Sequence, residues 1–362
     1  MSLSVGEVKK AANSTATSAA ASRVQIVDIV KGIAILLMVF GHTEQGGMHR
    51  NWWVSMPTFV VGIHFTDALI YSFHMASFFF IAGLFIPQSI SRRGGGEFVL
   101  EKVRTILYPY LLWGILFGLS VPFTTNLRVT GQAFSWKNLA MSMVTGDASW
   151  FLVTLFICQI FALAVYRLPH WAQMIVALAA CYLVPESSVT VLFAPFLYFP
   201  FVVAGMWFGA RRLPVFTNLR LWQALLGFAV LLAIQAAIIF RTGPVTRWDR
   251  FPIGLCGIAM VLLLSQAIDR TLVSRIFIWF GEASLSIFLF ASFFQVFERE
   301  VLLRVFHTTA PVPQLFLASL ITPIVPALLW HYQKQLHIEW FFRWPSAKRT
   351  TKGTPKPQTA AA

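Results

Sequence analysis

The sequence predicts an all-α, polytopic integral membrane protein with about ten transmembrane helices. Hydrophobic residues make up 57% of the 362 residues and charged residues only 12%, and the mean hydropathy is +0.70. A soluble chain of this length needs more polar residues to cover its surface. The 35 Phe and 13 Trp residues are typical of a protein that faces lipid and carries aromatic side chains at the membrane interfaces.

Apolar stretches of roughly 20 residues, the length that crosses about 30 Å of hydrocarbon, recur along the chain. The fifth stretch is short, and either a tilted or a re-entrant helix fits it. No internal repeat is evident, which counts against a transporter built from inverted repeats. The predicted spans lie near residues 24–43, 68–88, 103–122, 150–167, 171–184, 191–210, 220–240, 252–268, 276–296 and 312–331.

Polar segments flank these spans on both sides. Residues 1–22 are rich in Ala, Ser and Thr and lack the apolar core of a signal peptide, so we expect a disordered cytoplasmic tail. Residues 23–332 form the predicted membrane domain. Residues 333–362 form a basic cytoplasmic tail, which is polar and contains Pro from residue 345 onward and is expected to be disordered there.

The formal net charge of +14 indicates orientation in a membrane rather than nucleic-acid binding. The basic residues are spread over short loops and the C-terminal tail, and they form no patch with interleaved aromatic residues. A cytoplasmic N-terminus places most of these residues inside, as the positive-inside rule requires, so both termini are expected in the cytoplasm. Arg241, Arg247 and Arg250 run against the rule. Either their loop is misplaced or they face an anionic group, which makes Arg250 a candidate for substrate binding.

The three cysteines, Cys158, Cys181 and Cys256, lie within apolar stretches and form no Cys-x-x-Cys pair. They support neither a disulfide framework nor a zinc site, and we expect them to be buried as small hydrophobic residues. Two membrane histidines without a third ligand are too few to indicate a metal site, so no metal is expected.

The first span contains Asp28, Lys31 and His42. A charge at the centre of a transmembrane helix costs about 2.5–3.5 kcal/mol, so such residues usually face the interior of a bundle and have a function. Asp28 and Lys31 can pair on one helix face. Lys31 and His42 share a face and lie about 16 Å apart along the helix axis. The alternatives are that Lys31 snorkels to the interface and that His42 is interfacial.

The second span holds His74 at a depth similar to that of His42, because this span runs from outside to inside. A neutral imidazole near pH 7 can take a proton from a hydroxyl group, which is the task of a general base. The alternative is a buried histidine that only satisfies hydrogen bonds. In the ninth span, Glu282 is an intramembrane carboxylate that could orient a histidine or could be a helix-start charge satisfied by its neighbours.

Two motifs make the sequence recognisable. Asp28-x-x-Lys31-Gly32, followed by His42 eleven residues after Lys31, resembles the first-helix motif of the membrane-bound acyltransferase 3 family. Phe73-His74-Met75-x-x-Phe78-Phe79-Phe80-x-x-Gly83 resembles its second-helix motif in the branch of fucose O-acetylases and nodulation-factor acetyltransferases. Trp150-Phe151-Leu152 and Gly281-x-x-Ser284-Leu285-x-Ile287 also look like family blocks. The resemblance covers roughly residues 23–332.

The resemblance implies transfer of an acyl group, usually acetyl from cytoplasmic acetyl-CoA, to a hydroxyl of a glycan or another envelope acceptor. It also implies a multi-pass protein of the bacterial cytoplasmic membrane. His42 takes the place of the catalytic histidine, and Lys31 that of the basic residue ahead of it. Arg104 matches the last arginine of a basic motif that opens the third span.

The chain departs from the family pattern at two positions. Glu101 stands in the first slot of the basic motif, with Lys102 beside it, which leaves the residues that contact phosphate open. Relatives commonly carry a histidine in the ninth span where this chain has Phe290-Ala291-Ser292. The absence of that acceptor-side histidine gives His74 more weight.

A physical account of the chemistry follows from these expectations. The phosphates of CoA should dock on a basic cluster in the second inner loop, although the positive-inside rule predicts the same residues. The pantetheine arm would then pass Lys31 toward His42, the predicted general base. The oxyanion needs a donor, for which His74, Ser77 and Trp150 are candidates. The basic cluster consists of Arg92, Arg93, Lys102 and Arg104.

Two other classes of function remain open at the level of the sequence. A transporter or flippase of a polar envelope precursor shares the buried charges but moves its cargo without acyl transfer. A structural or regulatory membrane protein would not depend on His42. The acceptor sugar, the hydroxyl that is acylated and the oligomeric state are not encoded in any motif that we recognise.

Overall fold

The computed structural model describes residues 5–49, 53, 55–124, 135–146, 149–210, 219–269 and 271–345. The side chains of residues 5–24, 49 and 121–124 lie outside the described part. Residues 5–22, where the sequence predicts a disordered tail, are the first part of helix α1 in the structure, and the prediction for the tail beyond residue 345 lies outside the described residues. Within the described residues the structure is helical and contains no strand, which confirms the all-α prediction.

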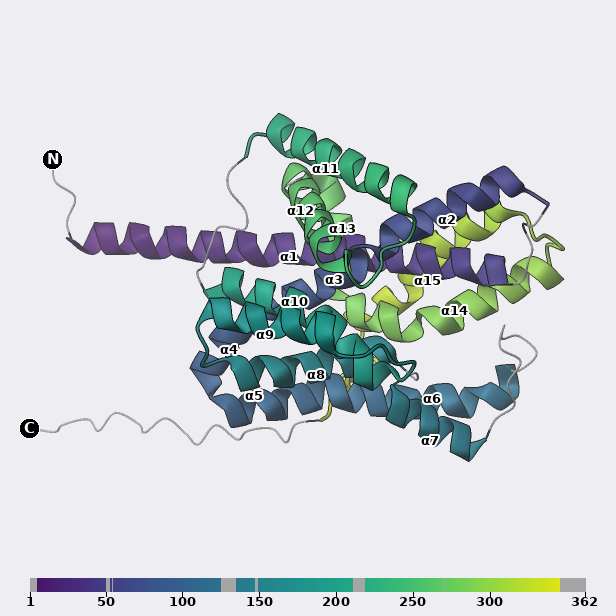
Figure 1. The fold of residues 1–362 in the computed structure, drawn as a ribbon, viewed down its shortest axis with the longest axis horizontal. Coiled ribbons are helices and arrows are strands. Elements are labelled where there is room, and N and C mark those ends of the chain that lie inside the picture. Colours follow the sequence, from purple (N-terminus) through teal and green to yellow (C-terminus); the bar gives the residue numbers. More distant parts are fainter. Residues whose placement is uncertain are drawn as a thin grey trace, which may run out of the picture.

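Figure 1 shows the helices in chain order, and most of them run roughly along the long axis of the molecule. They are α1 (Val5–His49), α2 (Pro57–Tyr71), α3 (His74–Leu84), α4 (Ile86–Arg93), α5 (Gly95–Lys102), the π-helical turn η1 (Val103–Leu107), α6 (Tyr108–Thr124), α7 (Trp136–Thr145), α8 (Trp150–Val165), α9 (His170–Leu183), α10 (Thr190–Ala210), α11 (Leu221–Thr242), α12 (Arg250–Ile268), α13 (Leu272–Glu282), α14 (Ser284–Arg304), α15 (Pro311–His331) and the short η3 (Glu339–Phe341).

Each of the ten predicted spans falls on a helical segment. Among the described residues, eight segments are long and apolar enough to cross a membrane. The ninth predicted span falls on α13 and α14, which meet the same criterion together but are bent by 76°. The fifth falls on α9, which has only 14 residues. The protein is therefore a polytopic membrane protein, with a bend at Ala283 that periodicity did not predict.

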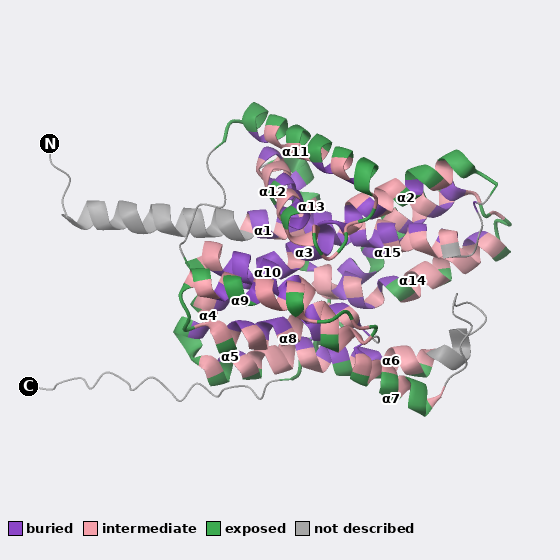
Figure 2. Ribbon diagram, in the orientation of Figure 1, coloured by how far each residue is buried: buried purple, intermediate pink, exposed green. Residues whose placement is uncertain are grey.

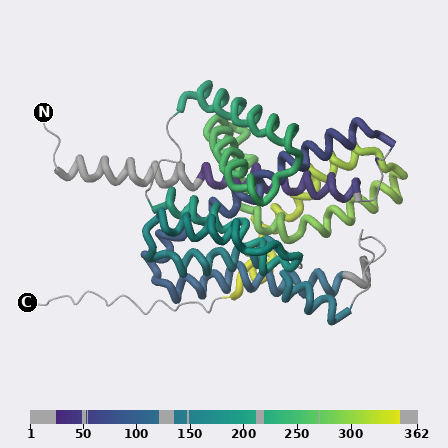
Figure 3. Tube along the Cα trace, viewed as in Figure 1, coloured from purple at the N-terminus to yellow at the C-terminus, as the bar shows by residue number. Residues whose placement is uncertain are grey.

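Helix α1 is the central element of the bundle. It contacts α2, α3, α12, α13, α14 and α15, and Ile29, Ala34 and Val39 along it are almost completely buried. Figure 2 shows buried residues concentrated on α1, α3 and α10. In Figure 3 the purple trace of α1 runs beside the yellow trace of α15. A helix with neighbours on so many sides can hold polar side chains away from lipid.

Two glycines let α13 lie directly against α1. A Cβ atom at Gly32 would overlap the carbonyl oxygen of Phe277, and one at Gly281 would overlap the carbonyl oxygen of Asp28. Small residues of this kind allow the backbones of membrane helices to approach closely. Gly83 has the same role between α3 and α10, against Val202. The glycines of the three sequence blocks thus lie at helix–helix contacts.

The chain after α15 folds back onto the bundle. The indole of Trp113 donates a hydrogen bond to the carbonyl of Phe341 (2.9 Å), and the backbone N–H of Trp344 donates to the carbonyl of Arg104 (3.0 Å). Phe342 is buried against the core. The first part of the predicted C-terminal tail is therefore packed against η1 and α6, which its basic composition did not indicate.

Candidate active site

The ion pair predicted on the first span is present. The ammonium group of Lys31 lies 2.6 Å from a carboxylate oxygen of Asp28, and both side chains are partly buried. The backbone of Asp28 is covered by Gly281 of α13, which holds this turn of α1 in place. Pairing offsets the cost of placing either charge inside the bundle.

His42 is held by a tyrosine from the next helix. Its Nδ1 lies 2.8 Å from the hydroxyl oxygen of Tyr71 at the end of α2. Gly41 provides the room, because a Cβ there would lie 2.9 Å from the ring of Tyr71. A hydrogen bond to one ring nitrogen orients the imidazole and determines which nitrogen carries the proton. A base oriented by a third group is the arrangement that general-base catalysis uses.

His74 packs against the tyrosine that holds His42. Its Nδ1 donates a hydrogen bond to the carbonyl of Ile70 (2.8 Å), and its side chain is buried. The Tyr71 ring packs edge-on against the His74 ring, with 4.7 Å between the centroids. His74 therefore supports the tyrosine that holds His42. Ser77, another candidate for the oxyanion, donates its hydroxyl to the carbonyl of Phe73 (3.0 Å).

Tyr71 is the residue that sequence reasoning missed. The only signal was a phenol three residues before His74 in an otherwise apolar stretch. Its partner is 29 residues away along the chain, so no local pattern connects the two residues.

Replacing Tyr71 by Phe is expected to lower kcat for the acyl transfer that the sequence resemblance implies about three- to tenfold, the effect of losing one hydrogen bond of about 0.5–1.5 kcal/mol. The ring contact with His74 is retained, so the fold should not change. Tyr182→Phe is the matched control, since that hydroxyl donates to the carbonyl of Trp248 on another part of the molecule. Equal turnover in both variants would show that Tyr71 does not orient the base.

A cavity of about 150 Å³ lies beside His42, where the second half of α1 meets α14 and α15. Most of its wall consists of polar or small residues. The lining residues are His42, Thr43, Gly46, Gly47, Ser292, Gln295, Val296, Glu298, Arg299, Leu302, Gln314 and Ala318. Of the predicted site residues, His42 is among these lining residues and the others are not.

Two predicted substrate-binding residues meet at the ring of Tyr198, outside the wall of the cavity. The guanidinium of Arg250 lies 5.9 Å from the ring centroid of Tyr198, and Trp150 packs on the same ring at 5.5 Å. Tyr198 in turn stacks on Phe79. The third predicted substrate-binding residue, Glu282, is exposed at the end of α13. It follows Gly281, which covers Asp28, so it lies toward the Lys31 end of α1 and away from the cavity.

The predicted phosphate-binding residues gather around the turn from α4 to η1. Arg92 and Arg93 end α4 and are exposed, Lys102 ends α5, and Arg104 lies in η1. The ammonium of Lys102 lies 5.1 Å from the ring centroid of Phe98. In Figure 1, α4 and α5 lie toward the end of the molecule where α1 begins. This basic turn and the His42 cavity are therefore at opposite ends of the bundle.

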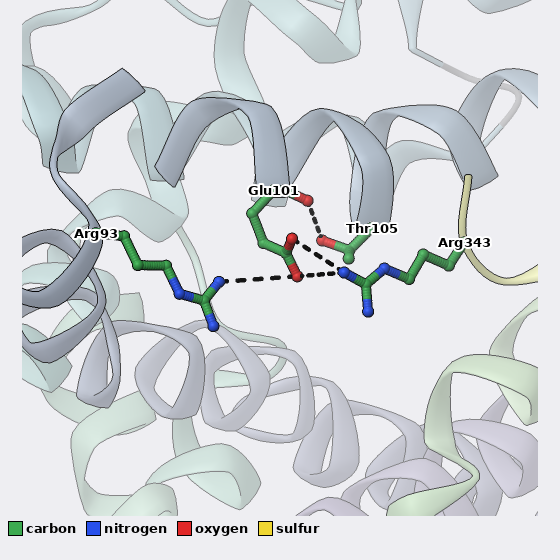
Figure 4. Close-up of polar contacts among 4 residues, drawn as sticks. All are labelled: Arg93, Glu101, Thr105 and Arg343. Carbon is green, nitrogen blue, oxygen red and sulfur yellow. Dashed lines mark hydrogen bonds and ion pairs between the residues drawn. The ribbon is translucent and has the colours of Figure 1, made fainter. Parts of the chain in front are cut away.

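Glu101 connects this basic turn to the C-terminal segment, as Figure 4 shows. One guanidinium nitrogen of Arg343 lies 3.1 Å from each carboxylate oxygen of Glu101. Arg93 approaches the same carboxylate at 3.9 Å. The acidic residue in the basic motif thus has a structural partner that comes from 242 residues further along the chain.

In the part of the chain that the structure describes, no three His, Cys, Asp or Glu side chains are grouped so that they could hold a metal ion. The candidate site residues fall into three groups: the Asp28–Lys31 pair, the chain of contacts His42–Tyr71–His74 and the basic turn.

The chain is similar to known proteins. The family model described as the acyltransferase domain of the acyltransferase 3 family matches residues 24–331. The nodulation protein NolL of Sinorhizobium fredii (strain NBRC 101917 / NGR234) is 36% identical over 89 residues. That stretch is 24% of this chain and 22% of the relative. No solved structure matches the chain.

Proposed function

The chain belongs to the acyltransferase 3 family, and from this premise we propose that it is a membrane-bound O-acetyltransferase. It moves acetyl from cytoplasmic acetyl-CoA to a hydroxyl of a sugar in an exopolysaccharide, a lipo-oligosaccharide or another envelope or secreted glycan. The observation that carries the proposal is that His42 lines a polar cavity while Tyr71 holds its Nδ1.

His42 acts as the general base of this reaction. As the acceptor oxygen attacks the thioester carbonyl, the imidazole takes the hydroxyl proton. Collapse of the tetrahedral intermediate forms the ester and breaks the C–S bond, and the imidazolium returns the proton to the sulfur of CoA. Tyr71 keeps the ring oriented and stabilises its protonated form when its oxygen accepts from Nδ1–H.

In this proposal the acetyl donor and the acceptor approach His42 from opposite ends of the bundle. The basic turn attracts the phosphates of CoA, and the Asp28–Lys31 pair lies between that turn and His42 along α1. The pantetheine arm extends the distance from Lys31 to His42, about 16 Å along the helix. The acceptor reaches His42 from the cavity side.

Labelled acetyl-CoA tests the proposal. Membranes that contain the protein should transfer label to a glycan, and envelope and secreted oligosaccharides should gain acetyl groups only when the chain is present. A 6-deoxyhexose such as fucose is the first acceptor to test, because the Phe73–Gly83 motif resembles that of fucose O-acetylases. Transport of a glycan precursor without transfer of label would identify a transporter or flippase instead.

Replacing Arg104 by Ala is expected to raise the KM for acetyl-CoA about tenfold or more, since a hydrogen bond to a charged group contributes about 1.5–3 kcal/mol. Lys102→Ala should have a smaller effect. The KM for the acceptor should stay the same. Arg304→Ala is the control, because Arg304 is an exposed arginine paired with Glu300 on α14. An unchanged KM for acetyl-CoA in both the Arg104 and Lys102 variants would mean that these charges only set the topology.

Both termini are expected in the cytoplasm, with the protein in the bacterial cytoplasmic membrane. The positive-inside bias of the loops supports this orientation, and CoA is a cytoplasmic donor. Reporter fusions at either end should respond as cytoplasmic fusions do. A C-terminus on the outer side would remove the proposed route for CoA.

A further inference from the structure

Two residues of the cavity wall, Glu298 and Gln314, carry buried polar atoms that have no partner in the described part of the chain. One carboxylate oxygen of Glu298 accepts a hydrogen bond from Thr322 (2.9 Å), whereas the other, Oε1, is buried and has none. Gln314 is only 4% exposed, and its amide nitrogen also lacks a partner. A buried polar group without a hydrogen bond costs about 1–3 kcal/mol, so two of them in one cavity wall indicate a polar ligand.

Gln295 ties this wall to the turn of α1 that carries His42. Its amide nitrogen donates to the carbonyl of Val39 (2.9 Å) and lies 3.2 Å from the hydroxyl of Thr43. The amide is therefore oriented by α1, and its oxygen is the group it can offer to a ligand. The cavity thus combines acceptors from Glu298 and Gln295 with a donor from Gln314, beside the imidazole of His42.

The charges and the size of the cavity define the class of ligand. The described lining contains one carboxyl group, on Glu298, and one guanidinium, on Arg299, so it has no excess of either sign. A cavity of about 150 Å³ in another protein holds one benzene molecule, so this partly open cavity has room for one six-membered ring and not for a longer oligosaccharide. Donors and acceptors spread over such a wall match a ring that carries several hydroxyl groups.

We propose that this cavity is the acceptor subsite and that it seats one pyranose ring of a neutral sugar. One ring hydroxyl donates to Oε1 of Glu298, another accepts from the amide of Gln314, and the hydroxyl to be acetylated faces His42. The inference rests on the proposed function for its reaction. In the proposed reaction the pantetheine arm ends at His42, so the part of the wall formed by Glu298 and Gln314 is left for the acceptor.

Acetyl transfer to methyl α-L-fucopyranoside by the full chain in detergent tests the subsite. Glu298→Gln retains an oxygen for Thr322 but presents an N–H where the sugar hydroxyl needs an acceptor, and Gln314→Leu removes the donor. Each variant should raise the KM for the fucoside on the order of tenfold, with the KM for acetyl-CoA unchanged. Glu300→Gln is the matched control, because Glu300 lies on the same helix, pairs with Arg304 and is not part of the cavity wall.

Thermal unfolding in the presence of methyl glycosides, without acetyl-CoA, measures binding at the subsite independently of the transfer reaction. The fucoside or another neutral methyl hexoside should raise the Tm of the unaltered chain and of Glu300→Gln, and should do so less for Glu298→Gln. A shift in Tm without any acetyl transfer would retain the subsite and overturn the proposed function. Two results would overturn the subsite. One is transfer by Glu298→Gln and Gln314→Leu with the same acceptor KM as the unaltered chain, and the other is an unchanged Tm with every glycoside.

Discussion

Replacing His42 by alanine is expected to abolish acetyl transfer while the protein still folds and inserts. The loss of a general base typically lowers the rate about 10²–10⁴-fold, and the loss is greater if the same ring also positions the acceptor. The side chain of His42 is only partly buried and borders the cavity, so its removal enlarges a space that already exists. The measurement is transfer of labelled acetyl by equal amounts of detergent-purified protein.

His64→Ala is the matched control, since His64 is an exposed histidine on α2 and should retain full activity. His74→Ala should lower the rate less than His42→Ala does, because His74 packs against the ring of Tyr71 and does not line the cavity. Groups that act as a unit are not additive, so Tyr71→Phe should add little to His42→Ala. Near-normal transfer by a well-expressed His42→Ala protein would contradict the mechanism.

Gly281→Ala is expected to have the largest effect on stability. The new Cβ would overlap the carbonyl oxygen of Asp28 on α1, and a backbone atom cannot move aside as a flexible side chain can. Overpacking usually costs about 1–3 kcal/mol, and here α13 would have to separate from α1, which disturbs Gly32 and Phe277 as well. The expected result is a strongly lowered Tm or loss of folded protein from the membrane.

Gly62→Ala controls for the change from glycine to alanine itself. Gly62 lies on α2, and no described atom comes within 4 Å of the position that an added Cβ would take. An alanine in a helix is favoured over glycine by roughly 0.5–1 kcal/mol, so the stability of this variant should be equal or slightly higher. A Gly281→Ala protein with an unchanged Tm would show that the close approach of α1 and α13 is not needed.

Sequence patterns determined the class of the fold and the ion pair on α1. Apolar stretches of the length of a span give helices at all ten predicted positions. The spacing of Asp28 and Lys31 gave the ion pair, because contacts three residues apart depend only on helix geometry. The motifs around His42 and His74 predicted the acyltransferase 3 family, which the family match confirms.

Tertiary structure alone decided how the site is assembled. Three of its hydrogen bonds join residues that are far apart in the sequence. Tyr71 and His42 are 29 positions apart, Gln295 and Thr43 are 252 apart, and Arg343 and Glu101 are 242 apart. The tertiary structure also places Glu282 away from the cavity and Arg250 beside Tyr198. Helical periodicity is local and states which residues share a face of one helix. Which helix meets that face depends on packing between backbones, and here that packing is set by contacts such as Gly281 against Asp28.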